Sequence, residues 1–100
     1  MGVVVSSDLQ RLLAALASPI RRQILWLVWD EPIAAGTIAS AFTLSAPTIS
    51  EHLAVLRDAG LVTIQVNGSY RRYRANQPAL LALHDLVLDE QQQARATQQA

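Results

Sequence analysis

The sequence predicts one mainly α-helical (α+β) domain with about five helices and a two-stranded β-hairpin. Apolar residues recur with a helical period before residue 60, with a period of two over residues 61–75, and again with a helical period after Pro78. The 100 residues are 51% hydrophobic and 16% charged, which is typical of a single folded domain. We therefore expect one domain over 1–100, with a structured core at 7–90 and a frayed Gln- and Ala-rich tail at 91–100.

Two helices open the chain. The first is predicted over residues 8–17 because its leucines repeat every three or four residues: Leu9, Leu12, Leu13 and Leu16. Ser7 stands before it at the spacing of a capping box. Ser18 and Pro19 then begin a second helix, since serine caps free backbone N–H groups and proline is tolerated at the first helical position. This helix is apolar around most of its circumference, which is typical of a central helix.

The third and fourth predicted helices are short and close together. Residues 34–42 form the third, and Thr43-Leu44 is a turn. Ser45 opens the fourth helix, predicted over 45–59 and ended by Gly60, with an inward stripe made of Ile49, Leu53 and Leu56.

The hairpin and the last helix follow. Residues 61–66 and 70–75 are rich in β-branched and aromatic residues, and they flank Asn67-Gly68, a strong hairpin signal. Pro78 begins a last helix over 78–90 whose apolar residues lie on more than one side. One side would pack on its own domain, and the other needs a different partner.

Two short helices joined by a turn and followed at once by a hairpin form a winged helix-turn-helix, in which helix 45–59 is the recognition helix. Only its first turns would reach base edges in a DNA groove. Serine and threonine hydroxyls donate or accept hydrogen bonds there, and Glu51 would accept one from a cytosine amino group. The residues expected at the bases are Ala46, Pro47, Thr48, Ser50 and Glu51.

The hairpin supplies positive charge to a chain whose net charge is zero. Three of the eight arginines stand within Tyr70–Arg74, where a period of two places Arg72 and Arg74 on one face and Arg71 on the other. Residues 34–76 carry four arginines against two carboxylates, whereas residues 77–100 carry three carboxylates against one arginine. A net charge of zero excludes a protein that binds nucleic acid through positive charge spread over its whole surface. The uneven distribution of the charge favours a local basic patch instead.

Three segments resemble the ArsR family of bacterial winged helix-turn-helix transcriptional repressors: LASPIRRQIL at 16–25, LSAPTISEHLAVLRDAGLV at 44–62 and GSYRRYR at 68–74. The resemblance runs from about residue 9 to residue 88. It implies a homodimer formed by the first and last helices. Two recognition helices would then enter successive major grooves of a pseudo-palindromic operator, with half-sites about 10 bp apart.

The expected partners are double-stranded DNA, a second copy of the chain and an unknown small-molecule effector. The residues expected to contact DNA are Ser45, Ala46, Pro47, Thr48, Ser50, Glu51, His52, Arg57, Ser69, Tyr70, Arg71, Arg72 and Arg74. The residues expected at the dimer interface are Leu9, Leu12, Leu13, Leu80, Leu83 and Val87.

We expect no metal and no cofactor. Many members of the family hold metal through a cysteine pair, but the corresponding positions here are Ala34 and Gly36, and the sequence contains no cysteine. One alternative is a repressor of this type that senses metal through side chains of the last helix, namely His84, Asp85, Asp89 and Glu90. A lone histidine beside carboxylates is more typical of a solvated helix face.

A second alternative is a winged-helix module that binds protein, for which an exposed apolar patch is expected at residues 46–51 and at the wing, in place of the short polar side chains and the arginines. An enzyme is disfavoured, because neither histidine has a nucleophile near it in sequence and no Gly-rich phosphate loop occurs. The longest apolar run, Ile24–Trp29, is far shorter than the ~20 residues of a membrane span, and residues 1–8 lack a secretory pattern. We therefore expect a cytoplasmic protein that does not bind membranes.

Overall fold

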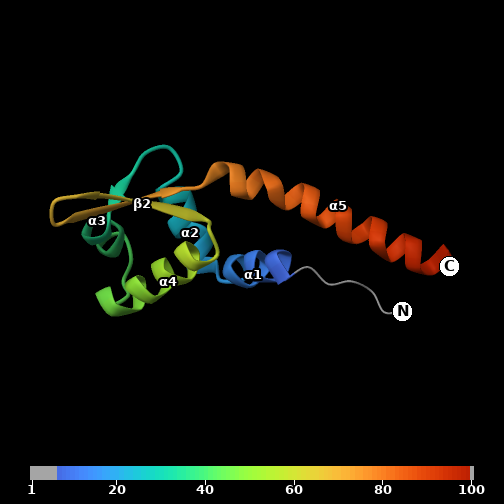
Figure 1. Cartoon of the computed structure of the whole chain (residues 1–100). Coiled ribbons are helices and arrows are strands. Elements are labelled where there is room, and N and C mark those ends of the chain that lie inside the picture. The colour runs from blue at the N-terminus through green and yellow to red at the C-terminus, as the bar shows by residue number, and fades with distance from the viewer. Residues whose placement is uncertain (1–6, 100) are drawn as a thin grey trace.

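The computed structural model describes residues 7–99, which form five helices and a three-stranded antiparallel sheet (Figure 1). In chain order these elements are α1 (Ser7–Leu16), α2 (Pro19–Leu27), β1 (Ile33–Ala34), α3 (Ala35–Ser40), α4 (Ala46–Asp58), β2 (Val62–Asn67), β3 (Tyr70–Ala75) and α5 (Gln77–Gln99). The winged helix-turn-helix predicted from the sequence is confirmed: α3 and α4 form the helix-turn-helix, and β2 and β3 form the wing.

Helix starts follow the expected chemistry at two places. Ser18 caps α2 by accepting a 3.3 Å hydrogen bond from the backbone N–H of Arg21, and Pro19 occupies the first helical position. Gly60 follows α4 with a φ of 75°, a left-handed conformation that favours glycine at a helix end. The capping role expected of Ser7 concerns a side chain outside the described ones.

The sheet has the strand order β1-β3-β2. Gly68, with a φ of 65°, turns β2 into β3, so that Asn67 lies opposite Tyr70 and Val62 opposite Ala75. The sequence predicts only two strands and assigns residue 34 to a helix. The structure corrects this, since Ile33 and Ala34 pair with Tyr73 and Arg72. A two-residue strand has no period of its own, and it exists here because β3 offers a free edge.

The core lies where α2, α4 and the base of the wing meet. The predicted inward stripe of α4 is confirmed, and Ile24 of α2 and Val28, the residue that follows α2, are fully buried as well. The apolar cluster consists of Leu12, Ala15, Ile24, Leu25, Val28, Ile38, Ile49, Leu53, Leu56, Leu61, Val62, Tyr73 and Ala75.

Helix α5 packs against this core only as far as Leu86. Two side chains fix its start: Asn76 donates a 2.9 Å hydrogen bond to the Gly60 carbonyl, and Gln77 donates one of 2.9 Å to the Trp29 carbonyl. The helix then projects from the domain to Gln99 (Figure 1). The expected helix end at residue 90 is therefore wrong. Residues 91–99 contain neither glycine nor proline, and glutamine, alanine and arginine are good helix formers.

Across residues 7–99, none of the helices combines the length and the apolar character that crossing a membrane requires.

Candidate nucleic-acid interface

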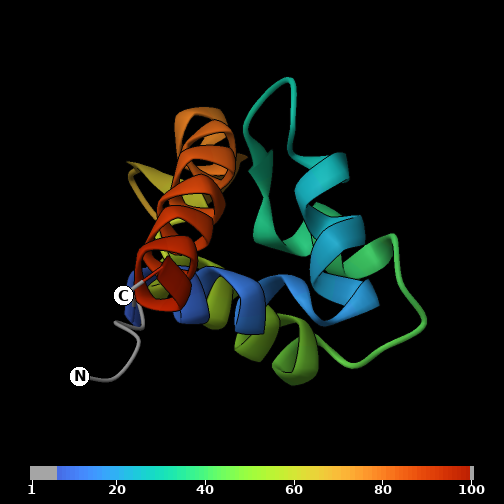
Figure 2. The same cartoon turned by 90° about the vertical axis from the view of Figure 1, so that its right-hand side faces the viewer.

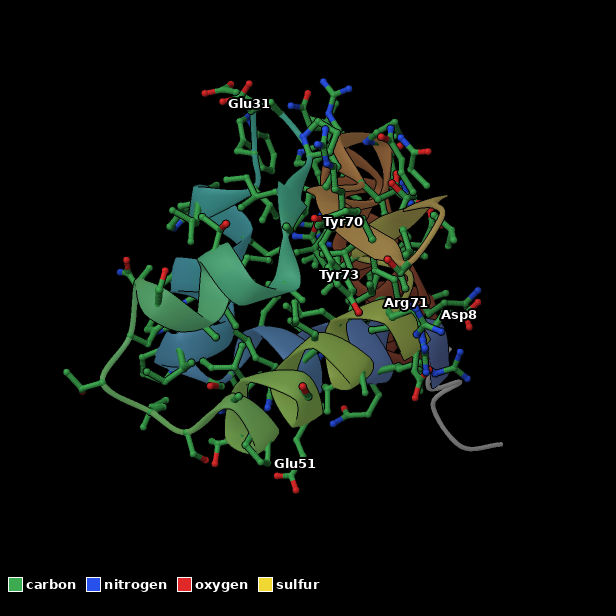
Figure 3. The ribbon with its side chains drawn as sticks, turned by 90° about the vertical axis from the view of Figure 1, so that its left-hand side faces the viewer. Asp8, Glu31, Glu51, Tyr70, Arg71 and Tyr73 are labelled. Atoms are coloured by element: carbon green, nitrogen blue, oxygen red, sulfur yellow. The ribbon has the colours of Figure 1, made fainter. Side chains whose placement is uncertain are left out.

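The recognition helix α4 is anchored on one side only. Ile49, Leu53 and Leu56 are buried along its length, while Ala46, Pro47, Ser50 and Glu51 are exposed on its first turns. Figure 3 shows Glu51 pointing away from the ribbon, at the opposite end of the view from Glu31. The short side chains and the carboxylate predicted to read bases therefore stand on an open surface.

The start of α4 is held by its own hydroxyl groups. Ser45 accepts a 3.4 Å hydrogen bond from the Thr48 backbone N–H, and its hydroxyl lies 2.9 Å from the hydroxyl of Thr48. Ser45 thus satisfies one of the free donors of the first turn. Both residues belong to the predicted DNA surface, and in the structure Ser45 also caps α4 with Thr48 as its partner.

The wing extends beyond the core and carries exposed arginines. Tyr73 is buried and anchors the hairpin, whereas Tyr70, Arg71, Arg72 and Arg74 are exposed. As the period of two predicts, Arg72 and Arg74 share one face, and Arg71 lies on the other. Arg71 shares its face with the buried Tyr73, but the core ends between these two residues. Both faces of the hairpin are therefore exposed to solvent at its tip.

None of the wing arginines is neutralised nearby. Among the described residues, no carboxylate lies within ion-pair distance of Arg71, Arg72 or Arg74. The wing and the first turn of α4 lie toward the same end of the molecule, and α5 projects toward the other (Figure 1). The structure thus places the uncompensated charge and the open helix surface toward the same end of the molecule.

Arg57 belongs to the far end of α4, away from the first turns. Its Nε and one terminal nitrogen both lie 3.4 Å from Oδ1 of Asp58, and both side chains are largely exposed. An exposed ion pair of this kind is weak, so Arg57 remains able to contact other anions. It is nevertheless separate from the arginines of the wing.

His52 faces the protein interior rather than the open surface. It is half-buried, and its Nδ1 lies 3.2 Å from a terminal nitrogen of Arg21. A guanidinium group only donates hydrogen bonds, so His52 accepts through Nδ1 in this contact. The sequence reasoning did not assign Arg21 to the site. The only available signal was its place in LASPIRRQIL, one of the segments that carry the family resemblance.

A cavity of about 480 Å³ lies between the wing and the start of α3. Alanine and glycine line one wall, including Ala34 and Gly36, the two positions where a cysteine pair was considered. Ser69, Tyr70 and Arg71 line the other wall. Thr37 of α3 also lines this cavity, so mostly small side chains of β1 and α3 face Tyr70 and Arg71 of the wing across it.

The expected dimer residues divide into three groups. Leu9 and Leu12 are only 2% and 9% exposed within this single chain, so they offer little surface to a second copy, and their place in the dimer interface stays a prediction. Leu80 and Leu83 are half-buried against the core. Leu13 and Val87 are 44% and 48% exposed, and two leucines of α5 that the predicted interface leaves out, Leu81 and Leu88, are exposed as well.

The last helix brings few metal ligands together. His84 Nδ1 lies 3.4 Å from Asp85 Oδ1, and both side chains are more than three-quarters exposed. Within residues 7–99, no three histidine, cysteine or carboxylate side chains converge on one point. This geometry lends no support to metal sensing by a single copy of the helix.

Comparison with known proteins adds independent information. Residues 16–65 match a family described as a helix-turn-helix domain. The transcriptional repressor SdpR of Bacillus subtilis (strain 168) is 36% identical over 66 residues, which cover 66% of this chain and 73% of SdpR. An ArsR-like transcriptional regulator from Rhodococcus sp. RHA1 superposes with a TM-score of 0.74 at 26% identity, covering 93% of this chain and 92% of that one.

A second solved structure is the homodimeric winged helix-turn-helix DNA-binding domain Mb0332 from Mycobacterium bovis, a possible ArsR-family transcriptional regulator. It superposes with a TM-score of 0.69 at 30% identity, covering 90% of this chain and 92% of that fragment. The likeness therefore includes α5 as well as the helix-turn-helix.

Proposed function

The chain belongs to the ArsR family of winged helix-turn-helix transcriptional regulators, and from this premise we propose that it represses transcription as a homodimer bound to a pseudo-palindromic DNA operator. One observation carries the proposal: the exposed first turns of α4 and the unpaired arginines of the wing lie toward the same end of the molecule (Figure 1). A DNA duplex is the partner whose grooves and phosphates match such a surface.

In this proposal the first turns of α4 enter the major groove. Ser50 and Glu51 are exposed there and offer one hydroxyl and one carboxylate to base edges. The wing arginines contact phosphates on either side and set the salt dependence of binding. Because the whole chain is neutral, nonspecific affinity is modest and specificity depends mainly on α4.

The proposed dimer uses the apolar surface on the projecting α5 and the adjoining α1. Leu13, Leu81, Val87 and Leu88 are exposed in the single chain, and burying them on a second copy would stabilise the assembly. The homodimeric state of the Mycobacterium bovis relative supports this arrangement. In the proposed dimer the two recognition surfaces lie at the outer ends, because α5 projects away from them.

The proposal includes one domain over residues 1–100, a cytoplasmic location and no catalytic role. It also includes a small-molecule effector that is not held by thiolates, because the sequence contains no cysteine. The protein-binding alternative receives no support from residues 45–51, whose exposed members are serine, alanine, proline and glutamate rather than large apolar residues.

The decisive experiment is selection of genomic fragments with the purified protein, followed by sequencing. We expect enrichment of a pseudo-palindrome whose half-sites are about 10 bp apart. A reporter placed behind the enriched site should be repressed by the protein. Failure to enrich any sequence would contradict the proposal and favour the protein-binding module.

The dimer has its own test, in which Val87 and Leu88 are both replaced by glutamate. Sedimentation should change from dimer to monomer, while circular dichroism stays the same because neither side chain is buried in the chain. The matched control is Gln92→Glu, which adds a charge to an exposed polar position of the same helix. A double variant that remains a dimer would exclude this face as the interface.

A further inference from the structure

Arg21 joins three elements through one side chain. Its Nε donates a 2.6 Å hydrogen bond to the Ala15 carbonyl, and one terminal nitrogen donates a 3.0 Å bond to the Ala14 carbonyl. The other terminal nitrogen donates to Nδ1 of His52 at 3.2 Å. The guanidinium group of α2 therefore connects the C-terminal end of α1 to the recognition helix α4.

The two carbonyl bonds hold this guanidinium group in place. The last carbonyls of a helix lack partners within the helix and attract positive charge, yet α1 has no basic residue in its own last turn. Arg21 supplies that charge from the next helix. Because a guanidinium group is planar and rigid, fixing two of its nitrogens also fixes the direction in which the third one donates.

Apart from the bonds of Arg21, α1 and α4 are linked through the shared apolar core, which is less directional. Leu12 and Ala15 share the apolar core with Leu53 and Leu56, and apolar packing has no preferred hydrogen-bond direction. At the other end of α1, a cavity of about 240 Å³ lies between its first turns, the turn after α4 and the start of α5. Figure 2 shows α1 crossing beneath α5, which it also contacts.

We propose that Arg21 is a positioning residue that sets the orientation of the recognition helix relative to α1 and α5. His52 is its hydrogen-bond acceptor on α4. This inference rests on the proposed dimer, in which α1 and α5 fix one copy against the other. The Arg21–His52 contact then helps to fix the separation and tilt of the two recognition helices. His52 acts through Arg21 and not by reading DNA.

Arg22 provides a matched control within the same turn of α2. It donates a 2.6 Å hydrogen bond to the Leu16 carbonyl, so it neutralises the same helix end. None of the hydrogen bonds of the described residues joins it to α4. Effects that come only from capping α1 should therefore appear equally in Arg21 and Arg22 variants.

The first measurement needs no DNA. In a double-mutant cycle with Arg21→Met and His52→Leu, we expect the two changes to be coupled by about tenfold in the unfolding equilibrium constant, because the hydrogen bond has a charged donor. The cycle of Arg22→Met with His52→Leu should show no coupling. Absence of coupling between Arg21 and His52 would overturn the inference, whether or not the protein binds DNA.

The second measurement uses operators whose half-site spacing is lengthened or shortened by one or two base pairs. Wild type and Arg22→Met should strongly prefer one spacing, whereas His52→Leu should lose about tenfold of that preference while remaining dimeric. His52→Asn restores an acceptor close to the Nδ1 position and should regain the preference, which a merely structural loss would not allow.

The outcomes separate the two proposals. Coupling together with a flattened spacing preference supports the positioning role. Coupling with an unchanged spacing preference would overturn it, since the bond would then serve stability alone. If no DNA is bound at all, the proposed function fails, and with it the role in DNA spacing, while the cycle still reports whether Arg21 links the two helices.

Discussion

Helices α4 and α5 both present exposed surfaces, but they are attached to the domain in different ways. The 13 residues of α4 bury Ile49, Leu53 and Leu56, one on each successive turn. Among the described side chains of the 23-residue α5 none is fully buried, and its apolar contacts with the core end at Leu86. The first turns of α4 expose only short or polar side chains and Val55 is the exposed large apolar residue farther along it, whereas α5 exposes Leu81, Val87 and Leu88.

The difference indicates two kinds of partner. A helix whose apolar stripe is wholly covered can offer polar groups at a fixed orientation, as recognition of DNA bases requires. A helix that projects with uncovered apolar residues gains stability only when another surface covers them. Single substitutions on the two helices test this contrast.

The largest effect is expected from Leu56→Ala. Leu56 is fully buried, so its truncation should lower the free energy of unfolding by about 2–5 kcal/mol. Leu88→Ala on α5 is the control, and at a dilution where the chain is monomeric it should cost about 0.5 kcal/mol or less. Denaturant titration measures both values. Equal losses would mean that α5 is held by the core as firmly as α4.

The next effect concerns sequence reading by α4. Ser50→Ala or Glu51→Gln should change the preference at a single base pair by ~1–3 kcal/mol and leave nonspecific DNA binding nearly unaltered. Competition binding with operators that differ at one position measures the change. A uniform loss across all operators would instead show that these side chains contact only the backbone of DNA.

A smaller effect is expected at the start of α4. Ser45→Ala removes the acceptor of the Thr48 N–H and the partner of the Thr48 hydroxyl, and should cost about 1 kcal/mol of unfolding free energy. Ser40→Ala is the control, since its hydroxyl donates only to the Thr37 carbonyl of its own helix. If the Ser40 variant loses as much stability as the Ser45 variant, the cap has no special role.

The smallest effect is expected from the wing. Arg72→Ala and Arg74→Ala should each weaken binding to all DNA sequences and reduce the slope of log affinity against log salt by about 0.9 for each lost phosphate contact. Fluorescence anisotropy over a salt series gives the slope. Arg95→Ala, an exposed arginine on α5, should leave the slope unchanged. Unaltered slopes in both wing variants would remove the wing from the interface.

Much of the recognition end was predictable because its signals are local. Hydrophobic period, the serine caps and Asn67-Gly68 depend on residues close together in sequence, and they indicated α2, α4 and the hairpin to within one or two residues. Once the buried stripe of α4 was predicted, the opposite side of the helix was expected to be exposed. The polar surface at 45–51 and the basic wing could therefore be derived from the residues alone.

By itself, the sequence determined the order of the elements, the recognition helix and the segregation of charge, because short-range periodicity and composition encode them. Only the tertiary structure decided that β1 joins the sheet, that Leu9 and Leu12 are buried within one chain, and that Arg21 contacts His52. These features depend on residues brought together from distant parts of the chain, such as Arg21 and His52, which are 31 positions apart in sequence. No local pattern records such a contact, since it forms only when the packing of several helices fixes the distance between them.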